Sequence, residues 1–233
     1  MQKRFGALFI FLLLLTGPAW AYDASYISLN QVNLAKLLAP PPAPQSDEQK
    51  LDLMAVLQAQ KDRTAPQSER AVADNDLSVF RIAGDMLGPN FTPARVPKTA
   101  AFFDRIWKDY RNIILATKDV WDRPRPLKVS TDVKPIGKLE NNGSYPSWHA
   151  TRGYLAAIIL SNMLPEKREG LFARAREYGQ NRVLAGDHFP SDIEAGRIAA
   201  TAMAVAFMQN EKFLKDFAEA KAELRSELGL SAQ

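Results

Sequence analysis

The chain has 233 residues, 46% of them hydrophobic, which is enough for one sizeable core and for one or at most two domains. It has no cysteine, which excludes disulfides, a thiol nucleophile and thiolate metal ligands. The formal net charge is +4, or +2 without Lys3 and Arg4, and the basic residues are scattered, so we expect no nucleic-acid partner.

The first 21 residues have the pattern of a secretory signal peptide. Lys3 and Arg4 provide a positive start, residues 7–15 are apolar, and Ala19-Trp20-Ala21 fits the small-x-small pattern that precedes a cleavage site. The apolar run is shorter than the roughly 20 residues that a membrane span needs, which disfavours a membrane anchor. We therefore expect a periplasmic or secreted protein with no membrane partner after cleavage.

Residues 22–45 are predicted to form an N-terminal lead-in, which ends in the extended, proline-rich segment 39–44. The main domain is expected to span residues 46–233. Its first helix is predicted to begin after Ser46, because Ser46 followed by Gln49 has the pattern of a capping box.

The rest of the chain has the apolar spacing of helices and no convincing strand alternation. After a first helix that Thr64 and Pro66 end, helices are predicted over residues 69–87, 100–118, 147–164, 165–185, 192–207 and 211–228. Residues 122–143 are rich in proline, glycine and polar side chains and predict a long loop, which in a compact domain is often functional. We therefore expect an all-α, single-domain helical bundle.

Arg182 is predicted to lie on an apolar helix face, because Leu171, Ala175 and Tyr178 precede it at helical spacing. An arginine in such surroundings needs an anionic partner, since burying it alone costs several kcal/mol of desolvation. The partner is either a buried aspartate or glutamate or a bound anion, and the spacing favours neither.

Two histidines occur in the chain, His149 at the start of a predicted helix and His188 in a break between two helices. Two are too few for most metal sites, so we expect no metal and no other cofactor. Asp192 follows His188 by four residues, a spacing that lets its carboxylate bond one ring nitrogen and leave the other basic, as in a catalytic triad.

Three blocks of residues occur in order around these side chains. They are Lys118, six residues and Arg125-Pro126; then Pro146-Ser147-Trp148-His149; then Asn181-Arg182, five residues, His188, three residues and Asp192. In order and spacing they resemble the motifs of the phosphatidic-acid-phosphatase type 2 (PAP2) superfamily, which includes the vanadium haloperoxidases. The flanking residues 37–44 and 142–147 resemble those of the bacterial class A non-specific acid phosphatases.

The resemblance implies a phosphate-binding set made of Lys118, Arg125, Arg182, Ser147 and the backbone N–H of Trp148. Two arginines and a lysine can stabilise the charge on phosphoryl oxygens without a metal, and the planar guanidinium suits those oxygens in pairs.

The resemblance also implies that His188 attacks phosphorus and forms a phosphohistidine, with Asp192 orienting its ring. His149 then protonates the leaving oxygen and helps to activate water. The expected protein is an exported, metal-independent acid phosphatase acting on small soluble phosphomonoesters, with its oligomeric state left open. The alternatives are a vanadate-dependent haloperoxidase, in which the histidine at position 188 coordinates vanadate, and a phosphate-binding protein without turnover.

Two residues depart from the family pattern. Trp148 stands where the family has glycine, so we expect its ring to narrow or cap the pocket. Asn181 replaces serine and can still donate and accept hydrogen bonds.

Overall fold

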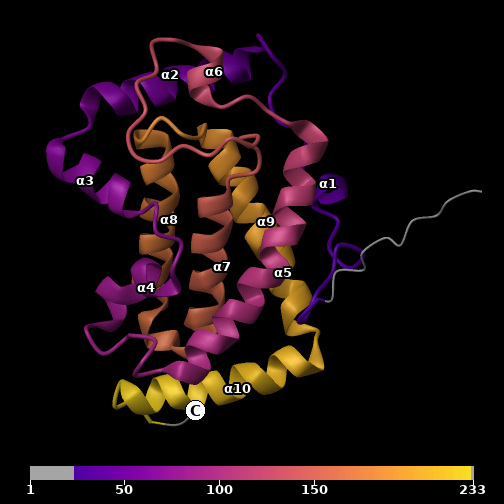
Figure 1. Cartoon of the computed structure of the whole chain (residues 1–233), viewed down its shortest axis with the longest axis vertical. Helices are drawn as coiled ribbons and strands as arrows, with labels where there is room; N and C mark the ends of the chain where they lie inside the picture. The colour runs from indigo at the N-terminus through magenta and orange to yellow at the C-terminus, as the bar shows by residue number, and fades with distance from the viewer. Residues whose placement is uncertain (1–23, 232–233) are drawn as a thin grey trace, which may run out of the picture.

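A computed structural model describes residues 24–231, so the predicted signal peptide lies outside the described residues. All regular elements of the described residues are helices (Figure 1), which confirms the predicted all-α class. In chain order they are α1 (Leu34–Leu37), α2 (Asp47–Asp62), α3 (Ala65–Ala73), α4 (Val79–Leu87), α5 (Pro97–Trp121), α6 (Pro126–Val129), α7 (Trp148–Met163), η1 (Pro165–Lys167), α8 (Arg168–Leu184), α9 (Pro190–Met208) and α10 (Glu211–Glu227). None of the described helices combines the length and apolar composition that crossing a bilayer requires.

Helix α7 forms the centre of the bundle, with α5, α8 and α9 alongside it and α10 crossing the lower end (Figure 1). Its side chains are buried nearly all round, which explains why the apolar pattern of this segment shows little preference for one face. The loops that join α5 to α7 and α8 to α9 lie together at the upper end of the bundle.

Gly196 allows the first turns of α9 and α7 to approach closely at that upper end. A Cβ at this position would lie 2.9 Å from the carbonyl oxygen of Ser147 and 2.9 Å from the Cβ of Ala150. The two turns are also joined by a hydrogen bond of 2.9 Å from the Ser147 N–H to the Asp192 carbonyl. The residues at the start of both helices therefore line the same space.

The predicted helix 69–87 is wrong, because the chain forms two shorter helices, α3 and α4, with a link between them. The buried carboxylate of Asp74 accepts two hydrogen bonds from Arg174 of α8, which fixes the link to the bundle. Asp76 then accepts a bond from the Ser78 N–H, and the Ser78 hydroxyl caps α4. Local side-chain bonds of this kind compete with helix continuation, and here they prevail because the link is also held by tertiary contacts.

The other predicted helices are present with shifted ends. Helix α5 is longer at both ends than the predicted 100–118, and the loop 122–143 contains the short helix α6. The predicted N-cap at Ser46 is confirmed, since its hydroxyl accepts a bond from the Gln49 N–H at the start of α2, while the Gln49 side chain accepts a bond from Arg123. Such differences at helix ends are usual where caps and neighbouring loops decide the last turn.

The lead-in packs against the bundle. Asp109 of α5 accepts hydrogen bonds from the backbone N–H groups of Tyr26 and Ile27, and Leu38 is buried. The hydroxyl of Tyr145 donates to the carbonyl of Ala39. This bond holds the chain just before the first turn of α7, where three of the predicted site residues follow.

Candidate active site

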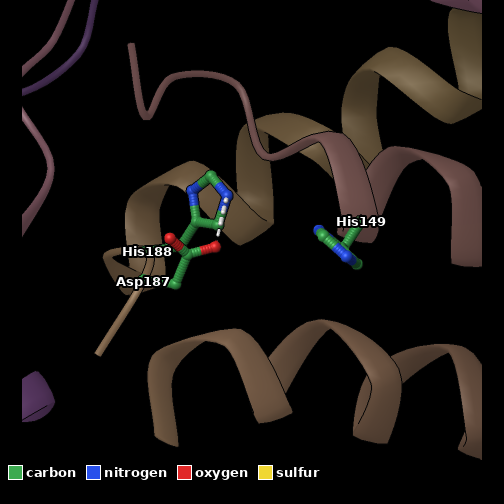
Figure 2. Close-up of side chains that lie close together, drawn as sticks. All are labelled: His149, Asp187 and His188. Carbon is green, nitrogen blue, oxygen red and sulfur yellow. Dashed lines mark ion pairs between the residues drawn. The ribbon is translucent and has the colours of Figure 1, made fainter. Parts of the chain in front are cut away.

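The residues predicted from the sequence meet at the upper end of the bundle. Lys118 lies in the last turn of α5, Arg125 precedes α6, and Arg182 lies in the last turn of α8. Figure 2 shows His149 in the first turn of α7 on one side and His188, before α9, on the other. Every predicted site residue except the partly exposed Trp148 is buried.

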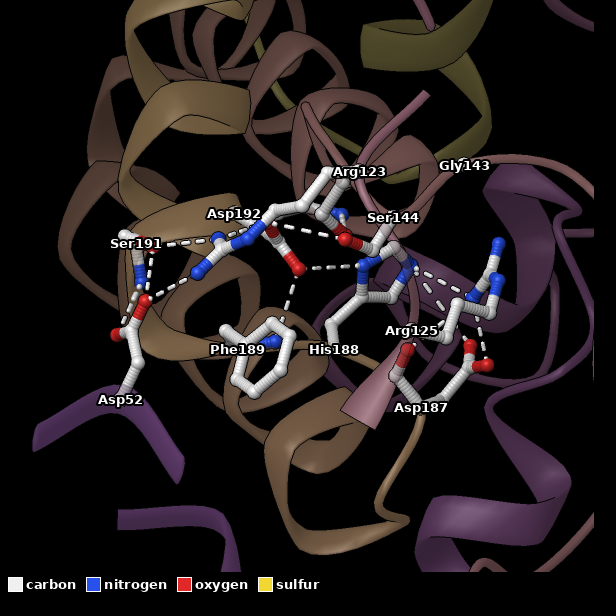
Figure 3. A network of polar contacts seen from close by, with 12 residues as sticks. Asp52, Arg123, Arg125, Gly143, Ser144, Asp187, His188, Phe189, Ser191 and Asp192 are labelled. Carbon is white, nitrogen blue, oxygen red and sulfur yellow. Dashed lines mark hydrogen bonds and ion pairs between the residues drawn. The ribbon is translucent and has the colours of Figure 1, made fainter. Parts of the chain in front are cut away.

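His188 and Asp192 form the predicted contact, with Nδ1 of the ring 3.3 Å from Oδ2 of the carboxylate (Figure 3). The same carboxylate oxygen accepts a bond of 2.9 Å from the Phe189 N–H. A carboxylate partner at Nδ1 selects the tautomer that carries its hydrogen there, so the lone pair of Nε2 is directed to the opposite side of the ring.

Arg123 holds the other oxygen of Asp192 and was not found from the sequence. Its Nη1 donates to Oδ1 of Asp192 at 2.6 Å, and its Nη2 donates to Asp52 and Gln49 of α2. The guanidinium also stacks over the Phe189 ring, 4.3 Å from its centre. Asp192 is therefore fixed from both sides, and α2 supports the site through Arg123. No periodicity marks Arg123 because it lies in a loop.

Arg182 has neither a buried aspartate nor a buried glutamate as an ion-pair partner among the described residues. It donates to Oδ1 of Asn75 at 2.6 Å and to the carbonyl of Ala71, while its Nε has no hydrogen-bond partner there. Lys118 likewise donates to a backbone carbonyl, that of Gly143, at 2.6 Å. Two buried cations that bond directly only to neutral groups can still take an anion as a direct partner, which is the arrangement an anion site requires.

Burial and the neighbouring cations lower the pKa values of the basic groups in this site. Burial, and then the charge of Arg125, lower the pKa of Lys118 to about 7. Burial also lowers the pKa of each histidine well below its ordinary value of 6.5. The next largest cause is the charge of Arg182 for His149 and the charge of Arg125 for His188. His188 is thus unprotonated, and able to act as a nucleophile, in mildly acidic solution.

The low pKa of Lys118 predicts a basic limb in the activity. The charge of Lys118 is present below about pH 7 and lost above it, so kcat/KM for a phosphate ester should fall as the pH rises through this value. Lys118→Met should lower kcat/KM below pH 7. The variant should also lose the decrease in kcat/KM near pH 7 that the deprotonation of Lys118 causes in wild type. The matched control is Lys61→Met, at an exposed position in α2. A pH profile of kcat/KM whose shape is the same in wild type and Lys118→Met would contradict the assignment.

His149 faces a cleft of about 200 Å³ that His188 and Arg125 also line. The Asn75 backbone accepts a hydrogen bond from its ring, and Nε2 has no partner among the described residues. Asn75 thus contacts both His149 and Arg182. Sequence reasoning missed Asn75 because it placed this residue inside a helix.

Trp148 forms one wall of the same cleft, together with Leu77 and Leu115. Its ring packs edge to face against Tyr110, with ring centres 5.2 Å apart, and its carbonyl accepts a bond from the Tyr110 hydroxyl. The indole is therefore held in place beside His149 as an apolar wall of a cleft that Arg111 and Glu140 also line.

His149, Asp187 and His188 bring possible metal-ligand atoms within 4.8 Å of one another (Figure 2). The surroundings oppose a cation, because the charges of Arg125, Lys118 and Arg182 that lower the pKa of His188 also repel a divalent ion. With three cationic side chains around these histidines, the site suits an anion better than a metal ion.

Comparison with known proteins gives one family and several relatives. The family model described as the PAP2 superfamily matches residues 110–215, a range that contains every predicted site residue. The chain is 29% identical over 214 residues to a non-specific acid phosphatase of Salmonella typhimurium, covering 85% of this chain and 83% of that protein. It is 29% identical over 210 residues to one of Providencia stuartii (86% and 85%) and 31% identical over 196 residues to an acid phosphatase of Zymomonas mobilis (80% and 74%).

Proposed function

The chain belongs to the PAP2 superfamily, and on that premise we propose that it is an exported, metal-independent acid phosphatase that hydrolyses small soluble phosphomonoesters through a phosphohistidine at His188. Hydrolysis of phosphoric monoesters is the activity that the names of its relatives imply. Export is supported by the signal-peptide pattern of the first 21 residues.

The observation that carries the proposal is the pair of buried cations, Lys118 and Arg182, whose charge no carboxylate contact among the described residues compensates. They lie around His188, a histidine held by Asp192 and kept neutral by its surroundings. Phosphoryl transfer needs positioning and stabilisation of the charge on the equatorial oxygens, and this arrangement supplies both.

In the first half-reaction, Nε2 of His188 attacks phosphorus while the bond to the ester oxygen breaks. On substrate binding His149 takes up a proton from solution, because the phosphate anion beside it raises its pKa, and the leaving oxygen then takes this proton. Asp192 stabilises the positive charge that develops on the His188 ring through Nδ1.

In the second half-reaction, water attacks the phosphohistidine. The neutral His149 left by the first step accepts a proton from that water, the bond between nitrogen and phosphorus breaks, and inorganic phosphate is released. The two histidines return to their starting protonation states, so one water is consumed for each ester cleaved.

The function is tested with the purified mature protein on a panel of phosphate esters across acid and neutral pH, with and without excess EDTA. We expect hydrolysis that is fastest in acid and survives the chelator, because arginine and lysine provide the charge that a metal supplies in other phosphatases. Activity lost to EDTA and restored by magnesium or zinc would contradict metal independence. Phosphate binding with no hydrolysis of any ester would favour the alternative of a binding protein.

Trp148→Gly should raise kcat/KM for bulky esters more than for small ones, because it removes an apolar wall of the cleft beside His149. The increase in kcat/KM should be roughly tenfold larger for bulky esters than for small ones. A tenfold difference lies within the roughly 1–3 kcal/mol that a change in pocket size contributes to substrate discrimination. Rates are compared for esters of increasing leaving-group volume and similar leaving-group acidity. Equal effects across sizes would show that the ring is not a size filter, and a total loss would show that substrates bind the indole.

A further inference from the structure

Every nitrogen of the Arg125 guanidinium donates a hydrogen bond, and Figure 3 shows the contact with Asp187. Nε donates to the carbonyl of Asn142 at 3.0 Å and Nη2 to Oδ1 of the same residue at 2.8 Å. Nη1 donates to the carbonyl and to Oδ1 of Asp187, at 3.1 and 2.6 Å. In contrast to Lys118 and Arg182, Arg125 is therefore paired with a carboxylate.

That carboxylate lies on the reactive side of His188. Oδ2 of Asp187 is 3.7 Å from Nε2 of His188, the nitrogen that faces away from Asp192. Its ligand atom is also within 4.8 Å of a ring nitrogen of His149. The Asp187 side chain, which is 2% exposed, thus lies beside both histidines and against Arg125, where the transferred phosphoryl group must be placed.

We propose that the Asp187 carboxylate is an internal anion that occupies the phosphate site of the empty enzyme and is displaced when phosphate binds. This proposal rests on the phosphatase function proposed above. A carboxylate and a phosphate both offer two oxygens to the same face of an arginine, so they compete for Arg125. They also repel each other at this separation, so both cannot remain beside Nε2 of His188.

A second cleft gives the displaced carboxylate a place to move into. It has a volume of about 450 Å³, and its walls include Asp187, Arg125 and Lys128. Arg125 and Asn142 line this cleft and also the smaller one that holds His149 and His188. In this proposal the Asp187 side chain rotates into that cleft, which Lys128 also lines, and so opens the space beside Nε2.

The consequence is that Asp187 sets how tightly the site holds phosphate. Because substrate and product must both separate the Arg125–Asp187 pair, the pair lowers the affinity for each. Product phosphate then leaves readily, since the carboxylate returns to Arg125 as phosphate departs. Asp187 would be a residue that determines affinity, and the covalent chemistry stays with His188 and His149.

The test is Asp187→Asn, which keeps the shape and the acceptor oxygen of the side chain but removes its charge. The inhibition constant of inorganic phosphate, measured as a competitive inhibitor of an aryl phosphate, should fall roughly tenfold or more, and KM should fall with it. An unchanged inhibition constant would overturn the proposal. A raised one would overturn it too, because it would show that Asp187 serves only to hold Arg125 in position.

Two controls keep this outcome interpretable. Asp132→Asn changes an exposed aspartate of the segment between α6 and α7 and should leave the inhibition constant within twofold of wild type. Asp187→Ser provides a second uncharged side chain if the asparagine variant does not fold, and thermal melting reports folding for each. Calorimetric titration with inorganic phosphate measures affinity without turnover, so the shift can be observed or refuted even if the wild type proves not to hydrolyse esters.

Discussion

His188→Ala should abolish turnover of every phosphate ester, with kcat/KM falling by at least about 10⁴-fold, because the nucleophile is needed whatever the leaving group. Nε2 of His188 is the nitrogen that Asp192 leaves unbonded and that faces Arg125 and the cleft. The loss is measured with both an alkyl phosphate and an aryl phosphate that has an acidic phenol. An aryl phosphate that is still hydrolysed at more than a hundredth of the wild-type rate would contradict the nucleophilic role.

Asp192→Asn is the graded companion to this variant. An amide in place of the carboxylate no longer stabilises the developing positive charge on the ring and favours the wrong tautomer, so turnover should fall for all esters but by less than in His188→Ala. The amide also removes the negative charge that pairs with Arg123, so thermal melting must accompany the kinetics. Calorimetric binding of phosphate separates a damaged site from an unfolded protein.

His149→Ala is expected to have a second large effect, one that depends on the leaving group. Turnover of alkyl phosphates should fall by roughly 10²–10⁴-fold, because an alkoxide needs a proton to depart. An aryl ester with an acidic phenol should still release one equivalent of phenol in a rapid first step, since a good leaving group departs without a proton. Stopped-flow measurement of phenol release resolves that step from the slow reaction of water with the phosphoenzyme.

The dependence on the leaving group is the part of this result that a structural role would not produce. A His149→Ala variant that merely disturbed the packing against Tyr178 would slow alkyl and aryl esters alike. Plotting the rate of the first step against the pKa of the leaving alcohol should give a steeper slope in the variant than in wild type. Equal slopes would remove His149 from the role of general acid.

The helical class and most helices could be predicted because they depend on apolar spacing, which is local. The predicted helix 69–87 failed for a reason that no local pattern contains. Asp74 ends α3 where Arg174, 100 residues further along the chain, binds its carboxylate in the folded protein. A polar residue that is exposed in one fold and buried in another has the same sequence signal in both.

The pairing of His188 with Asp192 could be predicted because their spacing reflects the geometry at the start of α9. Arg182 was indicated by its place on an apolar helix face, whereas Arg125 and the role of His149 came from the family resemblance. Asn75 and Arg123 were missed because their partners are distant. Asn75 contacts Arg182 across 107 residues, and Arg123 contacts Asp52 across 71. The pairing of Asp187 with Arg125 was missed for a further reason. Several charged residues lie near the predicted site, and the sequence does not show which of them form an ion pair.

The most direct test of the account is to find which residue carries the phosphoryl group. His149→Ala is mixed with an aryl phosphate that has an acidic phenol, quenched without acid after one burst, digested and mapped by mass spectrometry. Phosphohistidine at His188 should accumulate to about one equivalent per site, because water is a weak nucleophile without a base and the intermediate persists. Phosphate on Ser147 or on another side chain, or a full burst of phenol with no phosphorylated peptide, would contradict the mechanism.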